Sequence, residues 1–217
     1  TPTEYYAHLA SCRKLPTTSQ PSPELFEKFY LEAAAAGDEV LGIFLSHELS
    51  GTWQCAKLAA DLANVDNVLF VDSATVCLGE SLLEHLHLVA AIDDLKYLRK
   101  GGRLPAAVAV AGGMLGIKPL ITIKDGKVAM AGKARGLPGA YVALFKKIEE
   151  LGGISPDFAA VAGYSSSLRE VQPIENYFRE NLHMSEPLVR QIGCVIGTHA
   201  GPGAFGLAFF DKGLVLE

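Results

Sequence analysis

Apolar runs alternate with helical patterns through the first half of the chain. Two near-continuous apolar runs, Glu39–Leu45 and Asn67–Val71, are typical of central parallel strands that are covered on both faces. Around them, apolar side chains recur at helical spacing and predict helices at 1–11, 22–37, 51–61 and from residue 78. This alternation predicts right-handed βαβ units around a parallel sheet. Ligands bind beyond the carboxyl ends of such strands, here at Ser46–Ser50 and Asp72–Ser73.

The second half of the chain predicts another α/β lobe, with a mixed sheet. Asp125-Gly126 between two apolar runs is a strong signal for a type I′ hairpin. Helices are expected at 93–100, 104–115, 139–151 and 168–182, and strands at 118–124, 127–133, 158–164, 188–195 and 206–210. We place the boundary near Ala90, so that residues 1–90 form an N-terminal α/β lobe and residues 91–217 a C-terminal α/β lobe.

The pair Ala90-Ala91 lies inside an unusually long helical pattern. The residues on its two sides would together form one helix of more than twenty residues without a cap. Helices of that length are uncommon in globular chains, and helix ends normally carry capping residues. We therefore expect these two alanines not to be neighbours in the complete protein.

Composition and charge narrow the classes of function. The chain has 19 Lys and Arg against 24 Asp and Glu, for a net charge of −5, and it carries no basic run that would indicate nucleic-acid binding. The longest stretch without charged or strongly polar residues, Pro105–Ile117, has 13 residues and is too short to span a bilayer. The chain has four cysteines, which lie far apart and form no C-x-x-C pair: Cys12, Cys55, Cys77 and Cys194. This spacing predicts free thiols in a reducing cytoplasm, and it predicts neither a metal site nor a redox cofactor.

Three loops carry the polar groups that could recognise a small anion. The first, Thr17–Pro23, is rich in hydroxyls and prolines, although a plain linker has the same composition. The second, Ser50–Gln54, places hydroxyls at a helix N-terminus, where N–H groups and the helix dipole favour an anion, although ordinary capping also explains them. The third surrounds His199 with glycines, and this imidazole can carry charge near neutral pH. Two arginines, Arg103 and Arg135, lie beside glycines. An ordinary solvated surface position would explain either arginine without a functional role.

In this order, these segments resemble the DegV family of bacterial fatty-acid-binding proteins. The resemblance covers about Thr1 to Phe210 and rests on six ordered blocks: Thr17–Pro23, Ser50–Gln54, Val71–Ser73, Leu95–Arg103, Leu115–Leu120 and Gly197–Ala204. It implies a two-lobed α/β fold with the lipid carboxylate at the lobe interface and the tail buried in the C-terminal lobe.

The same resemblance implies the binding residues. Thr18 and Ser50 are expected to hydrogen-bond the carboxylate, with Gly51 and Thr52 completing the turn at the helix start. The resemblance also implies that His199 lies close to the carboxylate and that Arg135 lies at the mouth of the site. It implies no cofactor, and it suggests that a separate fatty acid kinase subunit phosphorylates the bound carboxylate to an acyl phosphate.

The chain departs from the DegV pattern in two places. Family members usually begin with a strand that carries an Asp-Ser-Thr turn, and no such strand precedes Thr1. Between Ala90 and Ala91 they have the rest of a helix, another helix and a strand. We therefore expect the N-terminal lobe to lack its first strand and the printed sequence to be part of a longer chain.

Three functions are compatible with these sequence features. The first is a carrier of one long-chain fatty acid, which the resemblance favours and which is not an enzyme by itself. The second is an esterase or thioesterase with Ser50 as nucleophile and His199 as base, but the chain has no G-x-S-x-G motif and no evident acidic partner for the histidine. The third is a binding module for a phosphorylated small molecule at the helix start near Ser50.

Overall fold

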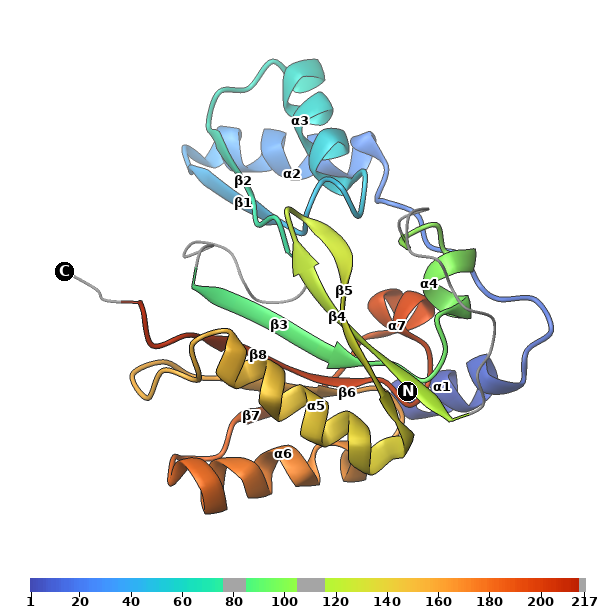
Figure 1. Ribbon diagram of the computed structural model, residues 1–217. Helices are drawn as coiled ribbons and strands as arrows, with labels where there is room; N and C mark the ends of the chain where they lie inside the picture. The colour runs from blue at the N-terminus through green and yellow to red at the C-terminus, as the bar shows by residue number, and fades with distance from the viewer. Residues whose placement is uncertain (76–84, 105–115, 215–217) are drawn as a thin grey trace. The chain divides into compact units, whose positions relative to one another are not determined.

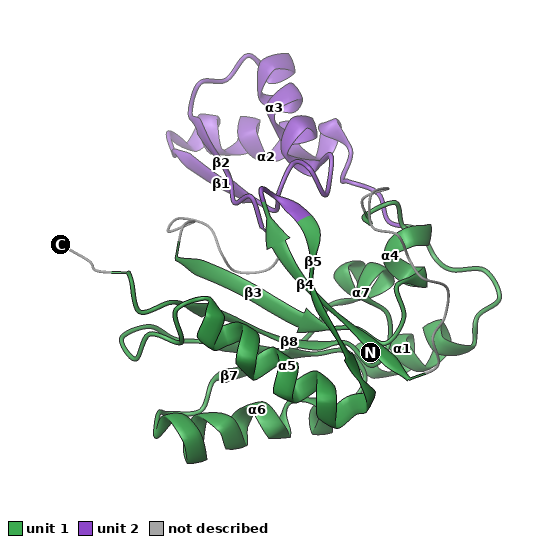
Figure 2. Ribbon diagram, viewed as in Figure 1, with its two compact units in different colours: residues 1–17, 84–124, 128–217 green, residues 18–83, 125–127 purple. Residues whose placement is uncertain are grey.

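The chain divides into two compact units. The computed structural model describes residues 1–75, 85–104 and 116–214 (Figure 1). Unit 1 comprises residues 1–17, 84–124 and 128–217, and unit 2 comprises residues 18–83 and 125–127 (Figure 2). The expected boundary near Ala90 therefore does not coincide with the division into units, because the chain crosses between them more than once.

Unit 2 is a small parallel sheet with two helices on one face. Its elements are α2 (Pro23–Ala36), β1 (Val40–Phe44), α3 (Thr52–Ala63) and β2 (Val68–Asp72). β1 and β2 pair in parallel from Val40 opposite Val68 to Phe44 opposite Asp72, which confirms the predicted parallel strands. The buried centre between helices and strands consists of Tyr30, Ala59 and Ala60, with Phe26 and Phe70 packed against them.

The other face of the β1–β2 sheet is open. The side chains of Leu41, Ile43 and Leu69 are 58%, 46% and 65% exposed. The prediction that these strands are covered on both faces is therefore wrong for this sheet. The sheet has only two strands, and both helices of the unit pack against the face that carries Val40 and Phe70.

Unit 1 is built on a six-stranded mixed sheet with the strand order β5-β4-β3-β8-β6-β7. The strands are β3 (Leu86–Ala91), β4 (Ile117–Lys124), β5 (Lys127–Arg135), β6 (Val161–Tyr164), β7 (Leu188–Gln191) and β8 (Phe205–Phe210). β3 runs antiparallel to β4 and β8, and β6 runs antiparallel to β8 and parallel to β7. The helices are α1 (Pro2–Ser11), α4 (Lys96–Lys100), α5 (Gly136–Glu150), α6 (Gln172–Tyr177) and α7 (Cys194–Ala200), with shorter helical turns at Leu168–Glu170 and Phe178–Leu182.

The expected helix across Ala90-Ala91 is instead a central strand. Ala90 pairs with Gly206 of β8 on one side and with Ile121 of β4 on the other. A short apolar run such as Leu86–Ala91 fits a buried strand as well as a helix, and only pairing with distant strands decides between them. The long uncapped helix does not form at these residues, so the argument that separated Ala90 from Ala91 fails. The first part of the helix predicted from residue 78, up to residue 84, and all but Leu104 of the helix predicted at 104–115 lie outside the described residues.

The predicted hairpin is confirmed. Asp125 and Gly126 both have positive φ angles, 51° and 72°, as a type I′ turn requires. The three residues of this tip, Asp125–Lys127, belong to unit 2, whereas the flanking strand residues belong to unit 1. Within unit 2 the hydroxyl of Ser46 donates to the carbonyl oxygen of Gly126 at 2.8 Å.

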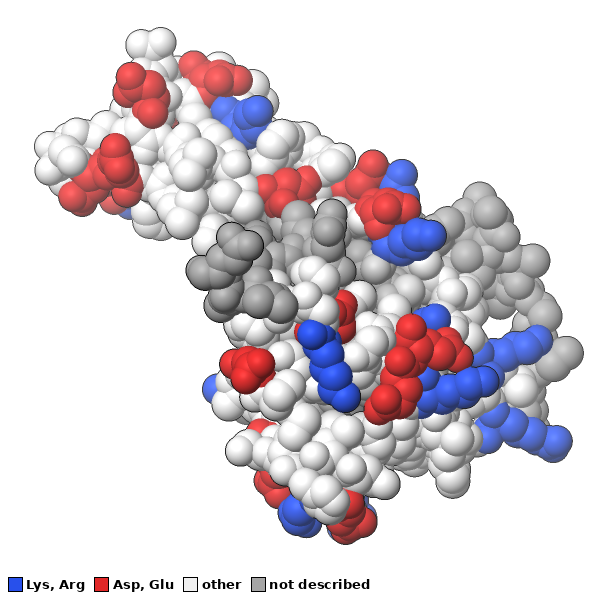
Figure 3. All heavy atoms as spheres, turned by 60° about the vertical axis from the view of Figure 1, so that its left-hand side comes forward, with Lys and Arg blue, Asp and Glu red and all other residues white. Residues whose placement is uncertain are grey.

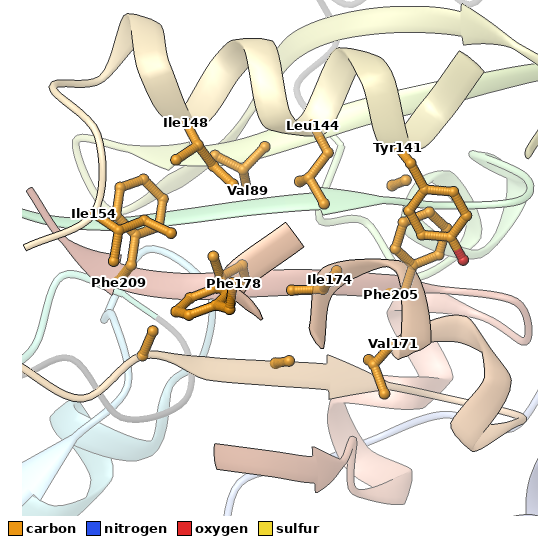
Figure 4. Packing of buried hydrophobic residues seen from close by; sticks show 14 of the residues in the cluster. Val89, Tyr141, Leu144, Ile148, Ile154, Val171, Ile174, Phe178, Phe205 and Phe209 are labelled. Carbon is orange, nitrogen blue, oxygen red and sulfur yellow. The ribbon is translucent and has the colours of Figure 1, made fainter. Parts of the chain in front are cut away.

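The hydrophobic core of unit 1 lies between the sheet and α5 and α6 (Figure 4). Leu144 and Ile148 of α5 point toward Val89, and Ile174 of α6 also lies in this cluster. The opposite side of the central strands carries the intervening residues, which are small or apolar: Leu88, Ala90, Gly163, Gly206 and Ala208. All of these except Gly206 are partly exposed, so the two faces of the sheet differ in burial.

Candidate functional site

The carboxyl ends of β1 and β2 are tied together by backbone hydrogen bonds. The N–H of Ser46 donates to the carbonyl of Thr75 at 2.8 Å, and the N–H of Ser73 donates to the carbonyl of Phe44 at 2.9 Å. Both serines are buried. This end of the sheet is where ligand-binding loops occur in parallel folds. These hydrogen bonds therefore fix the strand ends from which the turn Ser50-Gly51-Thr52 continues.

The turn Ser50-Gly51-Thr52 places two hydroxyls at the start of α3. The Ser50 hydroxyl accepts the N–H of Thr52 at 3.3 Å, and the two side-chain hydroxyls share a hydrogen bond of 2.8 Å. The N–H of Ser50 in turn donates to the carbonyl of Ser46 at 3.1 Å. These hydroxyls lie at the N-terminus of a twelve-residue helix, where an anion is favoured.

The loop Thr17–Pro23 lies against this turn. A Cβ atom on Gly51 would be 3.4 Å from the side-chain amide of Gln20, and the thiol of Cys55 donates to the carbonyl of Pro21 at 3.1 Å. Thr18, two residues before Gln20, is half-buried. The structure thus brings together the two hydroxyl-rich loops of unit 2, as the sequence-predicted site requires.

A histidine–carboxylate pair at the same strand ends was missed by sequence reasoning. The Nδ1 atom of His47 contacts the Asp72 carboxylate, which also accepts the N–H of Ala74 at 2.9 Å. Burial raises the pKa of Asp72, but the hydrogen bonds from Ala74 and His47 outweigh it and hold this pKa below its ordinary value. The centroid of the Trp53 ring lies 6.0 Å from that of the His47 ring, and the Lys57 ammonium lies 4.7 Å from the Trp53 centroid. The signal was available, because both residues follow adjacent parallel strands.

In unit 1, His199 lies on a helix and not in a loop. It belongs to the last turn of α7, a segment for which the sequence pattern predicts a strand at 194–195 and a loop at 196–200. Its imidazole lies directly against Gly101, where a Cβ atom would be only 2.1 Å from Nδ1. Burial lowers the pKa of His199, and the nearby charge of Arg103 lowers it further. The neutral imidazole is therefore favoured, although a histidine in general can carry charge near neutral pH.

Three close contacts that only glycine permits hold the helix of His199. Besides Gly101, a Cβ atom on Gly197 would lie 2.1 Å from the Tyr6 hydroxyl, and one on Gly201 would lie 2.4 Å from the Tyr97 ring. The Tyr6 hydroxyl donates to the carbonyl of Ile192 at 2.8 Å, so α1 is bonded to the segment that leads into α7. Side chains far apart in the sequence therefore determine where His199 lies.

The predicted residues fall into two groups. Thr18, Ser50, Gly51 and Thr52 lie in unit 2, and Arg135 and His199 lie in unit 1. The Arg135 side chain is exposed at the end of β5 and forms no ion pair within the described part of the chain. On the face shown in Figure 3, basic side chains are interspersed with acidic ones.

The esterase alternative finds no support in the described residues. The hydroxyl of Ser50, its required nucleophile, is engaged within its own turn, where it bonds to the hydroxyl and the N–H of Thr52. Among the residues that the structure describes, no group of three or more His, Cys, Asp or Glu side chains could hold a metal ion. No helix in the described ranges is long and apolar enough to cross a membrane.

The fold and these residues define a class of two-unit α/β proteins. One unit carries clustered hydroxyls, and the other carries a histidine that lies among glycines. The chain matches the uncharacterised DegV protein family over residues 1–86 and 79–212, and it belongs to that family. It is 34% identical to a DegV domain-containing protein of Deinococcus radiodurans over 90% of this chain and 78% of the relative. A second such protein, from Caldanaerobacter subterraneus, is 30% identical over 92% of this chain and 80% of the relative.

Solved structures extend this likeness to the fold. A DegV family protein from Thermus thermophilus, described as binding fatty acid, superimposes with a TM-score of 0.82 at 31% identity, covering 97% of this chain and 84% of the other. A DegV lipid-binding protein from Thermotoga maritima gives a TM-score of 0.78 at 26% identity, covering 95% and 81%. The two-lobed α/β fold with a small parallel sheet and a larger mixed sheet is therefore confirmed.

The comparisons also indicate where this chain lacks residues that its relatives have. The alignment with the Deinococcus protein spans 225 positions, more than the 217 residues of the whole chain, so the relative carries residues that this chain lacks. The family match is divided into two segments that overlap at residues 79–86. This break precedes nearly all of β3, and it does not fall between Ala90 and Ala91 as predicted.

Proposed function

We propose that the protein binds one long-chain fatty acid and holds its carboxylate with the hydroxyls of Thr18 and Ser50. The observation that carries this proposal is the packing of the Thr17–Pro23 loop against the Ser50-Gly51-Thr52 turn at the start of α3. A carboxylate removed from water needs several hydrogen-bond donors, and hydroxyls beside helix N–H groups are suited to this task. The likeness to the Thermus thermophilus protein supports fatty acid as the ligand.

His199 and Arg135 are proposed as further contacts from unit 1. A neutral imidazole can donate one hydrogen bond to a carboxylate oxygen without adding charge. The lowered pKa of His199 fits this role better than that of a permanent cation. The exposed guanidinium of Arg135 would then supply the positive charge.

The proposed place of the tail is the face of the unit 1 sheet opposite α5 and α6. The residues there are small or apolar, and most are partly exposed, notably Ala90, Gly163 and Ala208. Burying each methylene contributes about 0.8 kcal/mol, so a dozen methylenes contribute on the order of 10 kcal/mol before ordering costs. The tail would therefore provide affinity, and the head-group contacts would provide specificity.

Occupancy of the purified protein tests this proposal. Protein prepared without added lipid should carry roughly one fatty acid per chain, because affinity of that size survives dilution. Native mass spectrometry followed by solvent extraction measures both the stoichiometry and the identity of the ligand. Background lipid alone would refute the carrier function.

Substitution of the two hydroxyls tests the head-group site. Ser50→Ala and Thr18→Val should each weaken binding by about 1.5–3 kcal/mol, because a buried carboxylate loses a donor. Ser19→Ala is the matched control, since Ser19 lies in the same loop but is exposed. If displacement of a fluorescent fatty acid gives the same Kd for all three variants and the parent, the head group is assigned wrongly.

The proposed partner is a fatty acid kinase subunit. It would transfer the γ-phosphoryl group of ATP to an oxygen of the bound carboxylate, which yields an acyl phosphate and ADP. Arg135→Ala should lower acyl-phosphate formation more than it lowers lipid affinity, because an exposed guanidinium can stabilise the transferring phosphoryl charge. Lys133→Ala, two residues earlier on β5, is the control. Equal losses in both assays would assign Arg135 to binding alone.

A further inference from the structure

The turn that follows His199 is held by two consecutive serines. After α7 the chain turns through Gly201–Ala204 before entering β8. The N–H of Gly203 donates to the Ser166 hydroxyl at 3.0 Å, and the N–H of Ala204 donates to the Ser165 hydroxyl at 2.9 Å. The N–H of Ser165 returns a bond to the carbonyl of Ala204 at 2.9 Å. These three bonds connect the end of β6 to the residues directly behind His199.

The two serines are in turn held by one carboxylate. An oxygen of Glu170 accepts the N–H groups of Ser165 and Ser166, each at 3.2 Å. The backbone of Glu170 is itself anchored, because its carbonyl accepts the hydroxyl of Tyr141 on α5 at 2.9 Å. Burial raises the pKa of Glu170, and the backbone N–H groups of Ser166, Ser167 and Ser165 oppose that rise. Desolvating a carboxylate costs free energy, and hydrogen bonds from N–H groups offset part of that cost.

We propose that Glu170 is a positioning residue for the His199 turn: its carboxylate orders Ser165 and Ser166, and their hydroxyls hold the backbone of Gly203 and Ala204. The other side of the turn is already closed, because Gly201 lies against the Tyr97 ring and Gly203 lies against Asp93. Glu170 therefore supplies the remaining support. The turn that follows His199 is therefore held from both sides.

This inference rests on the proposed function for its effect on ligand binding, but not for its effect on the turn. Glu170→Ala removes the acceptor of the Ser166 N–H and one of the two acceptors of the Ser165 N–H, which keeps the carbonyl of Ala204. Amide exchange at Gly203 and Ala204 should then become roughly tenfold faster in the ligand-free protein, since their own bonds lose support. Fatty-acid affinity should fall by about five- to tenfold, as expected when one hydrogen-bonded support is lost.

Two further variants separate positioning from general damage. Glu170→Gln keeps one acceptor oxygen, so exchange and affinity should stay within about twofold of the parent. Ser166→Ala removes the acceptor of the Gly203 N–H, together with a long 3.5 Å bond to the Ser165 hydroxyl. It should reproduce faster exchange at the Gly203 amide while leaving the Glu170 carboxylate in place. Glu180→Ala is the control, because Glu180 is an exposed carboxylate in the following helical segment.

Amide exchange is measured residue by residue by NMR, and affinity by displacement of a fluorescent fatty acid. Unchanged exchange at Gly203 and Ala204 in Glu170→Ala would overturn the proposal. Faster exchange with parental affinity would overturn it as well, since the turn would then not matter to binding. A parent protein that binds no fatty acid would refute the proposed function, while the exchange data would still decide whether Glu170 holds the turn.

Discussion

Gly101→Ala directly tests whether the position of His199 matters. Gly101 has φ −76° and ψ −6°, which alanine adopts without strain, so the backbone tolerates the change. The added Cβ atom would lie 2.1 Å from His199 Nδ1, whereas ordinary contacts begin at 3.4 Å. The imidazole must therefore move by roughly 1 Å or more, and overpacking of this kind costs about 1–3 kcal/mol. Reduced entropy of the unfolded chain offsets about 0.4–1 kcal/mol, so the net destabilisation should be about 0–2.6 kcal/mol.

Affinity should suffer more than stability, because a displaced imidazole no longer reaches its proposed oxygen. Losing a hydrogen bond to a charged group corresponds to about 1.5–3 kcal/mol, or at least tenfold in Kd. Urea unfolding measures the first effect, fluorescent fatty-acid displacement the second, and the imidazole NMR signals report whether the ring has moved. Gly132→Ala is the control, since its Cβ atom would meet nothing within 4 Å and its φ is not positive. A moved ring with parental affinity would refute the role of His199.

Three other outcomes follow from single contacts. Gly126→Ala should destabilise the protein by about 2 kcal/mol in urea unfolding, because its φ is +72° and the Cβ atom would lie 2.6 Å from the Ser46 hydroxyl; an unchanged midpoint would contradict this. For Asp211, burial raises the pKa, but hydrogen bonds led by that from His87 hold it below its ordinary 3.8. Its stabilisation is present above that ordinary pKa and is lost as the pH falls from there through the folded pKa, so Asp211→Asn should flatten the loss of stability below pH 3.8. Parallel pH profiles would exclude the effect. Finally, p-nitrophenyl acyl esters should show no turnover above buffer, because the Ser50 hydroxyl is bonded to Thr52 within its own turn; stoichiometric labelling of Ser50 by a fluorophosphonate would revive the esterase.

Local signals in the sequence determined much of the framework. Thr1 and Glu4 form a capping box at the start of the helix predicted at 1–11, and Gly37 ends α2 in the left-handed conformation. Asp125-Gly126 forms the predicted type I′ turn, and the Ser50 hydroxyl lies at the start of a helix. Each of these features depends on residues at most a few positions apart, so the sequence contains the whole interaction.

Only the tertiary structure decided the features that depend on distant partners. The run that contains Ala90 is a strand because β4 and β8 pair with it, and nothing in the run itself distinguishes strand from helix. His199 favours the neutral form because burial and the charge of Arg103, 96 positions earlier, lower its pKa. Tyr6 joins α1 to the segment before α7 across 186 positions, which placed the first helix in unit 1 and not with the strands that follow it in sequence. Pairing, burial and charge act through space, and an apolar pattern along the chain specifies that a face is buried without specifying what buries it.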